Sequence, residues 1–186
     1  MTDLLEYLIN NGISKNNSKY LISHFKEKKY AKKSSVLEMG ENNQIICFIK
    51  KGLVRGYYIN EHGDEVTKCF AKENEWCCVY NLLSNAPSEF YIETLEDSIL
   101  AEIHIDILKK SLNTIPQLQK LLSNLLSHTL IQKEQRNLQF QRMNAKERYA
   151  LFLSENSDLA SRINQEYIAS YIGITKTSLS RLKKDL

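Results

Sequence analysis

The chain has 186 residues, of which 42% are hydrophobic and 25% are charged, and its formal net charge is +3. This length allows one large domain or two small ones, and the hydrophobic content is sufficient to build a buried core. Because the sequence contains no run of about 18 apolar residues, it predicts no membrane-spanning helix and favours a cytoplasmic protein.

The first segment, residues 2–29, has apolar residues at helical spacing in two groups, which a turn at Asn11–Gly12 separates. Its N-terminal end lacks the basic lead and the uninterrupted apolar run of a signal peptide. Five lysines lie between Lys26 and Lys33, and we interpret this run as a solvated surface rather than a binding patch.

The next segment, from Ser34 to His104, consists of short stretches rich in Ile, Val, Tyr, Phe and Thr that alternate with turn residues. This pattern is typical of an antiparallel sandwich or jelly roll. The stretch from Trp76 to Glu89 interrupts it with small and turn-forming residues, so we predict a loop or a short helix there.

The four cysteines have no C-x-x-C spacing, and the four histidines do not cluster with them; the cysteines are Cys47, Cys69, Cys77 and Cys78. In a reducing compartment this pattern argues against structural disulfides. We expect the four cysteines to act as small, buried apolar side chains. We predict no metal site and no cofactor. A redox-sensing role for the adjacent Cys77 and Cys78 is the alternative.

The segment from Pro116 to Met143, which follows a short predicted helix, contains no further Gly or Pro. Its leucines form a broad apolar stripe, and one seam has the alternating four-and-three spacing of a coiled coil. The seam consists of Leu118, Leu122, Leu125, Thr129 and Gln132. A helix of this length must cover two faces, which favours association with a second copy of the chain. A core helix that buries one face is the alternative.

The C-terminal segment starts at Asn144, which together with Glu147 predicts a capping box at the start of a helix. The stretch Asp158–Ile163 could hold one short strand. From Asn164 onward the sequence predicts two short helices, with Gly173 at the positive-φ position of the tight turn between them.

The second of these helices has an apolar arc, formed by Leu179, Leu182 and Leu186, opposite a polar and cationic arc. This arrangement predicts a helix-turn-helix, in which one side packs on the preceding helix and the other enters the major groove. The predicted DNA-contacting residues are Thr175, Lys176, Thr177, Ser180, Arg181 and Lys184. A helical hairpin with a solvated basic face is the alternative.

The charge distribution favours DNA binding. Residues 142–186 hold eight Lys and Arg against five Asp and Glu, whereas residues 1–141 hold seventeen of each. The whole positive excess therefore lies in the last quarter of the chain, where the predicted recognition helix is located.

The order of a β-rich module, a long helix and a helix-turn-helix resembles the CRP/FNR family of bacterial transcription regulators. Glu38–Tyr58 is similar to the opening of the family's cyclic-nucleotide-binding jelly roll, and Ile163–Leu182 matches its helix-turn-helix without gaps. The resemblance implies an α+β fold: an N-terminal antiparallel jelly roll with flanking helices (1–114), a long dimerisation helix (115–143) and a truncated winged helix-turn-helix (144–186).

The family resemblance also implies a function. Lys176, Thr177 and Arg181 occupy the family's main base-reading positions, and members are homodimers that read palindromic sites. The implied partners are double-stranded DNA, a second copy of the chain and RNA polymerase. The chain stops soon after the recognition helix, where members with a full wing continue, and it lacks the N-terminal cysteine cluster of the iron–sulfur members.

The predicted effector pocket departs from the family's nucleotide-binding pattern. Val79 falls where the ribose-binding Glu would be, and Glu89 falls where the phosphate-binding Arg would be. Ile131 and Gln132 replace the base-contacting Thr and Ser of the long helix. The predicted, degenerate pocket consists of Trp76, Val79, Tyr80, Leu82, Glu89, Phe90, Ile131 and Gln132. We therefore expect no useful binding of cyclic AMP or cyclic GMP.

The sequence shows no Ser/His/Asp, Cys/His, paired-carboxylate or phosphate-loop pattern, so we predict a regulator and not an enzyme. Two alternatives stay open. One is a redox or small-molecule sensing module with weak or vestigial DNA binding, and the other is an interaction protein that uses the long helix as a scaffold.

Overall fold

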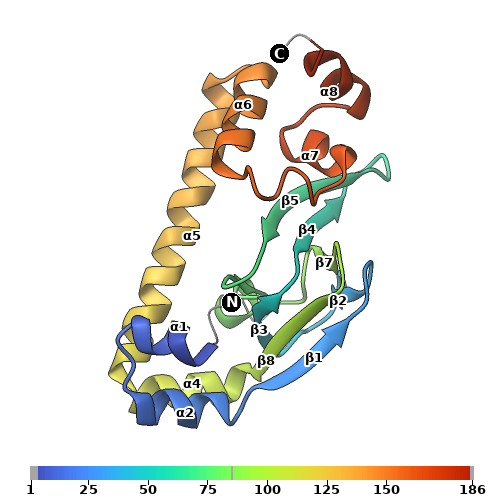
Figure 1. Ribbon diagram of the computed structural model, residues 1–186. Helices are drawn as coiled ribbons and strands as arrows, with labels where there is room; N and C mark the ends of the chain where they lie inside the picture. Colours follow the sequence, from blue (N-terminus) through green and yellow to red (C-terminus); the bar gives the residue numbers. More distant parts are fainter. Residues whose placement is uncertain (1–3, 85, 185–186) are drawn as a thin grey trace. The chain divides into compact units, whose positions relative to one another are not determined.

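The computed structural model describes residues 4–84 and 86–184 (Figure 1). The chain forms two compact units, the first from Met1–Gly56 and Phe70–Leu125 and the second from Tyr57–Cys69 and Leu126–Leu186. The sequence-based domain boundaries, after residues 114 and 143, stay a prediction. The compact units differ from them because the hairpin segment Tyr57–Cys69 packs with the C-terminal residues.

Two four-stranded sheets form the β-rich part of the chain, with strand orders β1-β8-β3-β6 and β2-β7-β4-β5. The pairs β1–β8, β2–β7, β3–β6 and β3–β8 are antiparallel. The strands are β1 (Lys26–Tyr30), β2 (Ser35–Leu37), β3 (Ile45–Lys51), β4 (Val54–Ile59), β5 (Glu65–Ala71), β6 (Trp76–Cys77), β7 (Tyr91–Thr94) and β8 (Ser98–His104). The predicted α+β class with an antiparallel jelly roll is confirmed.

Strand β1 contains most of the lysine run that the sequence identified only as a solvated surface. Its side chains are exposed except for Tyr30, and it is an edge strand that pairs with β8. No alternating apolar pattern marks such a strand in the sequence. Lysines on an edge strand discourage pairing with other chains, which gives the run a structural role.

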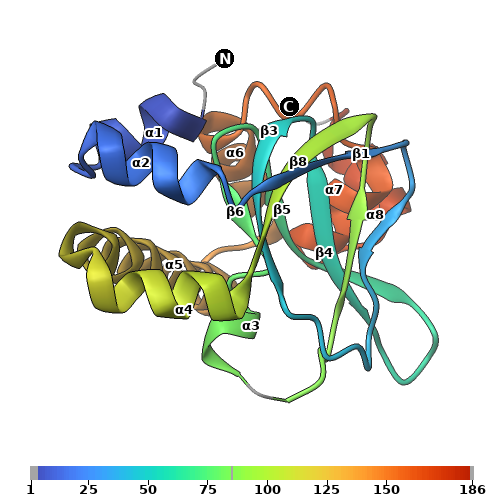
Figure 2. The ribbon, with the colours of Figure 1, turned by 90° about the horizontal axis from the view of Figure 1, so that it is seen from below.

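Helices α1 (Leu4–Asn10), α2 (Lys15–Ile22) and α4 (Ile105–Thr114) lie together beside the sheet that contains β3 and β8 (Figure 2). The predicted turn at Asn11–Gly12 separates α1 from α2. These helices and the sheet share one apolar core, whose fully buried members include Leu8, Ile13, Leu21, Ile46, Phe48, Ile103 and Ile105. Burial of this core stabilises the first unit.

A second apolar core lies within the β-rich part of the first unit. Its buried members include Leu37, Cys47, Ile49, Val54, Cys77, Cys78, Phe90, Ile92 and Leu100. The stretch between Trp76 and Glu89 contains strand β6 and helix α3 (Tyr80–Leu83). The predicted short helix is therefore present, and a short strand precedes it that the sequence did not indicate.

Helix α5 (Pro116–Arg142) has 27 residues and contributes to both units. Its buried residues are Leu118 and Leu121, both in the core of the first unit. Leu118 therefore packs within its own chain, although the sequence placed it in an intermolecular seam. Further along the helix, Leu130 is 68% exposed and Ile131 is 55% exposed. The described residues form no helix with the length and apolar character needed to cross a membrane.

The second unit contains α6 (Ala145–Glu155), α7 (Gln165–Tyr171) and α8 (Lys176–Leu182). The capping box at Asn144 and Glu147 is confirmed, with reciprocal hydrogen bonds between side chain and backbone. The predicted strand at Asp158–Ile163 is wrong. This stretch forms hydrogen-bonded turns, such as Ile163 N to Leu159 O at 3.0 Å, which satisfy its backbone locally. Leu186 lies outside the described residues.

Candidate DNA-binding surface and the cores that support it

The turn between α7 and α8 is built by local backbone hydrogen bonds. Ile174 N donates to Ala169 O at 3.0 Å, and Gly173 N donates to Ser170 O at 3.1 Å, which is the Schellman pattern. Gly173 has φ 75°, and a Cβ added to it would lie 2.6 Å from Cε1 of Phe140. Glycine is therefore required both by the left-handed backbone and by the close approach of Phe140.

Helix α8 presents the predicted DNA-contacting residues to solvent. Its N-terminus is capped by Thr175, whose hydroxyl oxygen accepts from Ser178 N at 3.1 Å. Leu179, at 1% exposure, faces inward and fixes the rotation of the helix. All six predicted residues are exposed: Thr175, Lys176, Thr177, Ser180, Arg181 and Lys184. The predicted two-faced helix is therefore present around Leu179.

Two lysines of this region contact α7. Lys176 Nζ lies 3.9 Å from Glu166 Oε2, and Lys183 Nζ donates to Gln165 Oε1 at 3.2 Å. Exposed pairs of this kind contribute about 0–1 kcal/mol, so an approaching phosphate can compete for the ammonium groups. Lys183 is a further candidate phosphate contact. Its position beside Lys184 was the sequence signal that could have identified it.

Two arginines that the sequence did not single out hold the end of α7. Arg148 donates from Nε to Ile172 O at 2.9 Å and from Nη1 to Met143 O at 2.7 Å. Arg136 donates from Nη2 to Tyr171 O at 2.9 Å. Guanidinium groups at a helix C-terminus satisfy orphan carbonyls and interact favourably with the helix dipole. The two side chains therefore fix α7, on which the recognition helix packs.

The hairpin segment Tyr57–Cys69 is bonded to the same helix. The Ser170 hydroxyl accepts from Thr67 N at 2.9 Å and donates to Glu65 O at 3.1 Å. Arg136 donates to the carbonyls of Thr67 and Lys68 as well. Figure 1 shows the beginning of β5 beside α7. These bonds explain why the hairpin belongs to the second unit.

The predicted effector-pocket residues lie in different surroundings. Trp76, Val79 and Leu82 pack against the core that contains Phe48, whereas Phe90 belongs to the second core. The rings of Tyr80 and Phe90 are in edge contact, with centroids 6.1 Å apart. Glu89 is exposed, and Ile131 and Gln132 are exposed residues of α5. The eight predicted residues thus include two separate groups. Trp76, Val79 and Leu82 pack against one core, and Tyr80 contacts Phe90.

A buried cation lies in the first unit at a position that the sequence analysis overlooked. Arg55 on β4 is 1% exposed, and its Nη2 lies 2.8 Å from Glu93 Oε1 on the neighbouring strand β7. A buried ion pair of this kind contributes little net stability, because desolvation offsets attraction, but removal of one partner is costly. The signal in the sequence was a single arginine within an otherwise apolar and aromatic strand.

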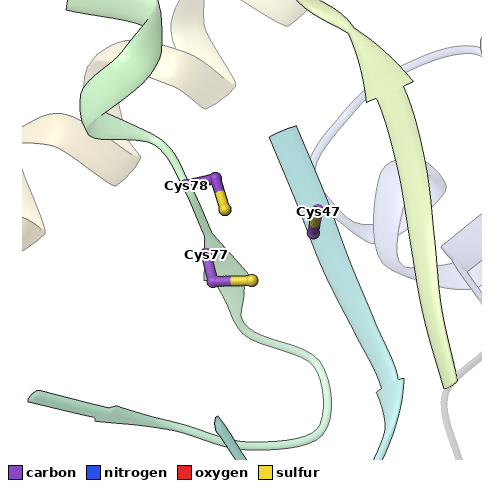
Figure 3. A group of neighbouring side chains, drawn as sticks. All are labelled: Cys47, Cys77 and Cys78. Carbon is purple, nitrogen blue, oxygen red and sulfur yellow. The ribbon is translucent and has the colours of Figure 1, made fainter. Parts of the chain in front are cut away.

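Three of the four cysteines meet inside the second core (Figure 3). Cys47 on β3 is directly opposite Cys77 on β6, and Cys78 follows Cys77. The three sulfur atoms lie within 4.8 Å of one another, and all three side chains are buried. Cys69 is exposed, so the expectation of buried thiols is wrong for this residue, which lies on the edge strand β5.

The thiols of this cluster have perturbed acidity. Hydrogen bonds with the Cys47 and Cys78 thiols, together with burial, raise the pKa of Cys77 well above its ordinary value. A hydrogen bond with Cys77 lowers the pKa of Cys47, but the bond with Cys78 and burial outweigh it, so this pKa is also raised. Both thiols are therefore neutral at physiological pH.

Comparisons with known proteins agree with this architecture. The family model described as "Cyclic nucleotide-binding domain" matches residues 27–114. The chain is 26% identical over 171 residues to "Electron transport regulator A" of Shewanella oneidensis, covering 84% of this chain and 67% of the relative. It is 26% identical over 167 residues to "Anaerobic regulatory protein" of Pasteurella multocida, covering 83% of this chain and 61% of the relative. The matches thus span about two thirds of the relatives' length.

Solved structures show the same fold. FixK2 from Bradyrhizobium japonicum aligns with a TM-score of 0.78 at 22% identity, over 87% of this chain and 84% of that chain. A mutant of CooA from Carboxydothermus hydrogenoformans aligns with a TM-score of 0.76 at 20% identity, over 99% of this chain and 84% of that chain. At this identity the likeness establishes the fold.

The fold and the family model together define the class of protein: a cyclic nucleotide-binding type of jelly roll that precedes a long helix and a helix-turn-helix. The chain is thus similar to proteins named as anaerobic and electron-transport regulators, and its residues 27–114 match the cyclic nucleotide-binding domain.

Proposed function

We propose that this protein is a DNA-binding transcription regulator that acts as a homodimer on a palindromic operator. One observation carries the proposal: Leu179 of α8 is buried, while all six predicted DNA-contacting side chains, on α8 and next to its two ends, are exposed. Arginine and short hydroxyl side chains on such a face can reach base edges, and lysines can reach phosphates. The names of the relatives, which describe regulators, support the same function.

The proposed dimer uses helix α5. Leu122 and Leu125 are half-buried in the single chain, and Leu130 and Ile131 are largely exposed. Association of two such helices would remove this apolar surface from water, which is favourable in proportion to the area covered. A dimer would also present two recognition helices to half-sites about 34 Å apart, one turn of DNA.

The proposed regulator has no enzymatic activity and does not depend on a cyclic nucleotide. The relatives' names describe regulation and no reaction. The pocket residues include an exposed Glu89 where the family's phosphate-binding arginine is expected, and the buried Arg55 is held by Glu93 at 2.8 Å. An anionic ligand would therefore have to break an existing ion pair to gain a buried cation.

A second candidate function, a sensing module with weak or vestigial DNA binding, is favoured by one observation. Three buried thiols converge in the core of the first unit, where the family model is matched. A protein that only senses would keep a ligand site there and lose specific DNA binding. The two functions are separated by measurement of DNA binding itself.

Genome-wide footprinting with the purified chain tests the proposal, because a regulator should protect a small set of related palindromic sequences. Affinity for the best site and for random DNA is then measured by fluorescence anisotropy at several salt concentrations. Arg181→Ala should cost about 1–3 kcal/mol and relax one base position, whereas Lys184→Ala should weaken all sequences and reduce the salt slope by about one.

The matched control is Lys133→Ala, which removes an exposed cation of α5 that lies outside the recognition helix. It should leave specific affinity unchanged. Equal losses on operator and random DNA for Arg181→Ala and Lys184→Ala would contradict the division between base reading and phosphate contact. If the double variant Lys176→Ala, Arg181→Ala binds the operator like the unaltered protein, the proposed recognition surface is wrong.

A further inference from the structure

The three buried cysteines are brought together by the backbone. Strands β3 and β6 pair with Cys47 opposite Cys77. Neighbouring residues of a strand normally point to opposite faces. Cys78 follows the last residue of β6 and has φ 63°, a conformation that residues with a Cβ seldom adopt. This turn allows Cys77 and Cys78 to join Cys47 in the same apolar core (Figure 3).

The spacing of the sulfur atoms suits coordination of one small soft centre. Bonds of about 2.3 Å from one ion to its thiolates, at angles of about 95–110°, place the sulfur atoms about 3.4–3.8 Å apart. The three sulfur atoms here lie within 4.8 Å of one another. Side-chain rotations that move each sulfur atom by about 1 Å would therefore bring them to the spacing needed for coordination. Among the described residues, no fourth His, Cys, Asp or Glu joins the group, which disfavours tetrahedral Zn²⁺.

The net charge of the complex decides which kind of ion can bind to three thiolates in this core. Three thiolates carry three negative charges, so a monovalent ion leaves a net charge of about −2 and a divalent ion about −1. Most of the surrounding side chains are apolar, among them Leu37, Ile49 and Leu100, all fully buried. Tyr30 belongs to the same core, and the exposed Lys28 acts on Cys47 from outside it. An uncompensated charge is expensive in such surroundings. A trivalent centre with three thiolates is neutral and avoids this cost.

We infer that Cys47, Cys77 and Cys78 form a binding site for a trivalent thiophilic element, with As(III), taken up as arsenous acid, as its representative. The reaction is a condensation without change of oxidation state: one As(OH)₃ and three S–H groups give one As(S–Cys)₃ and three water molecules. Three As–O and three S–H bonds break, and three As–S and three O–H bonds form. No oxidant or reductant takes part.

The site lies entirely in the first unit, so the inference is independent of the proposed DNA binding. It adds a ligand class that the sequence analysis did not predict. The spacing of the cysteines in the sequence does not indicate the site, because Cys47 and Cys77 meet only through the pairing of β3 with β6. The same three thiols could instead form a cross-strand disulfide when an oxidant is supplied, and the test excludes this route by keeping a phosphine reductant present.

The test is a titration of the full-length chain with sodium arsenite under reducing conditions. Trp76 is the only tryptophan and precedes Cys77, so its fluorescence reports binding beside β6. The expected result is saturation at one arsenic per chain and an intact mass that gains one arsenic and loses three hydrogens. No arsenic adduct, or an adduct that gains one As–OH group and loses only two thiol hydrogens, would overturn the inference.

Four single variants locate the site. Cys47→Ser, Cys77→Ser and Cys78→Ser should each weaken the arsenite dissociation constant about tenfold or more, because only two thiols remain. The matched control is Cys69→Ser, which alters an exposed cysteine outside the cluster and should leave the constant unchanged. Tight binding by Cys47→Ser would show that the vicinal pair suffices, and weak binding by Cys69→Ser would place the site elsewhere.

A measurement on the unaltered protein keeps the inference testable if a variant fails to fold. The chain is saturated with arsenite, treated in the folded state with a thiol-alkylating reagent for the time in which the arsenite-free chain reacts at all four cysteines, and digested for mass spectrometry. The expected result is protection of Cys47, Cys77 and Cys78 and alkylation of Cys69. Protection of Cys69, or alkylation of any member of the cluster, would contradict the three-sulfur site.

Discussion

Arg136 donates a hydrogen bond from Nη2 to the carbonyl oxygen of Tyr171 at 2.9 Å, and its guanidinium carbon lies 4.0 Å from the centroid of the Tyr171 ring. The same guanidinium donates to the carbonyls of Thr67 and Lys68. One side chain of α5 therefore binds the end of α7 and the β5 backbone at once. Its planar donors can serve several carbonyls, which a lysine ammonium at one point cannot reproduce.

Replacement of Arg136 by alanine should destabilise the second unit by about 2–3 kcal/mol, because the carbonyls of Thr67, Lys68 and Tyr171 lose a charged donor. The stability of Arg136→Lys should lie between that of the unaltered chain and that of Arg136→Ala, since a lysine ammonium can still donate to one of the carbonyls. Urea unfolding followed by circular dichroism measures the change. The matched control, Arg142→Ala, removes an exposed arginine from the same helix and should have a small effect. Equal effects of Arg136→Ala and Arg142→Ala would remove the structural role proposed for Arg136.

Gly173 and Gly63 provide a second comparison within the same unit. Both have positive φ, 75° and 84°, but a Cβ on Gly63 would meet nothing within 4 Å, whereas one on Gly173 would lie 2.6 Å from Phe140. Gly63→Ala should therefore cost about 1 kcal/mol from the backbone alone. Gly173→Ala should cost more, because Phe140 must move.

A double variant tests the origin of this difference. In the Phe140→Ala background the clash is removed, so the additional cost of Gly173→Ala should fall toward that of Gly63→Ala. The free energies of unfolding of the single and double variants give the coupling directly. An unchanged cost of Gly173→Ala without the Phe140 ring would show that the backbone conformation alone requires glycine.

Most of the helix-turn-helix could be predicted from the sequence, because its determinants are local. The caps at Asn144, Asn164 and Thr175, the turn at Gly173 and the inward position of Leu179 all depend on residues within one or two turns. The physical signals were side-chain acceptors at helix starts, a positive-φ glycine and apolar spacing.

The features that the sequence did not indicate depend on contacts between distant residues. Arg136 and Thr67 are 69 positions apart, and Arg55 pairs with Glu93 across neighbouring strands. Strand β1 was overlooked for another reason: an edge strand rich in lysine has no apolar alternation. Hydrophobic periodicity identifies elements and their buried faces, but strand register determines which polar groups meet.

The proposed dimer can be tested at Leu130, which is 68% exposed in the single chain. Leu130→Asp should leave the fold of one chain intact and give a monomer, because a dimer would have to desolvate the new carboxylates. Sedimentation velocity measures the outcome, with Gln135→Asp, at an exposed position of the same helix, as the control. A Leu130→Asp variant that sediments as the unaltered dimer would place the interface on another surface.

Cyclic AMP should bind weakly, with a dissociation constant above about 10 μM, equivalent to a binding free energy no more favourable than about −7 kcal/mol. The phosphate needs a cation, but Glu89 is acidic and exposed, and Arg55 is paired with Glu93. Titration calorimetry with cyclic AMP and cyclic GMP measures this. Glu89→Arg should raise the affinity if position 89 faces the phosphate, and Glu96→Arg serves as a charge-matched control. Tight binding by the unaltered chain would refute the expected pocket chemistry.

The buried thiols should make stability fall at alkaline pH. The pKa of Cys77 in the folded chain is raised well above 9.0 by its hydrogen bonds to the neighbouring thiols and by burial, whereas in the unfolded chain it is close to 9.0. Between these two values the folded chain binds more protons than the unfolded chain. The free energy of unfolding therefore decreases as pH rises above about 9, by up to about 1.4 kcal/mol per pH unit for one group.

The variant Cys77→Ala removes this contribution, because the tyrosines and lysines that also titrate in this range are common to both chains and Cys47 stays buried in both. Urea unfolding between about pH 7 and about pH 10 should give a steeper loss of stability for the unaltered chain than for Cys77→Ala. Cys69→Ala, which removes an exposed thiol, should follow the unaltered chain. Parallel curves for the unaltered chain and Cys77→Ala would mean that Cys77 has the same pKa folded and unfolded, which burial in this core argues against.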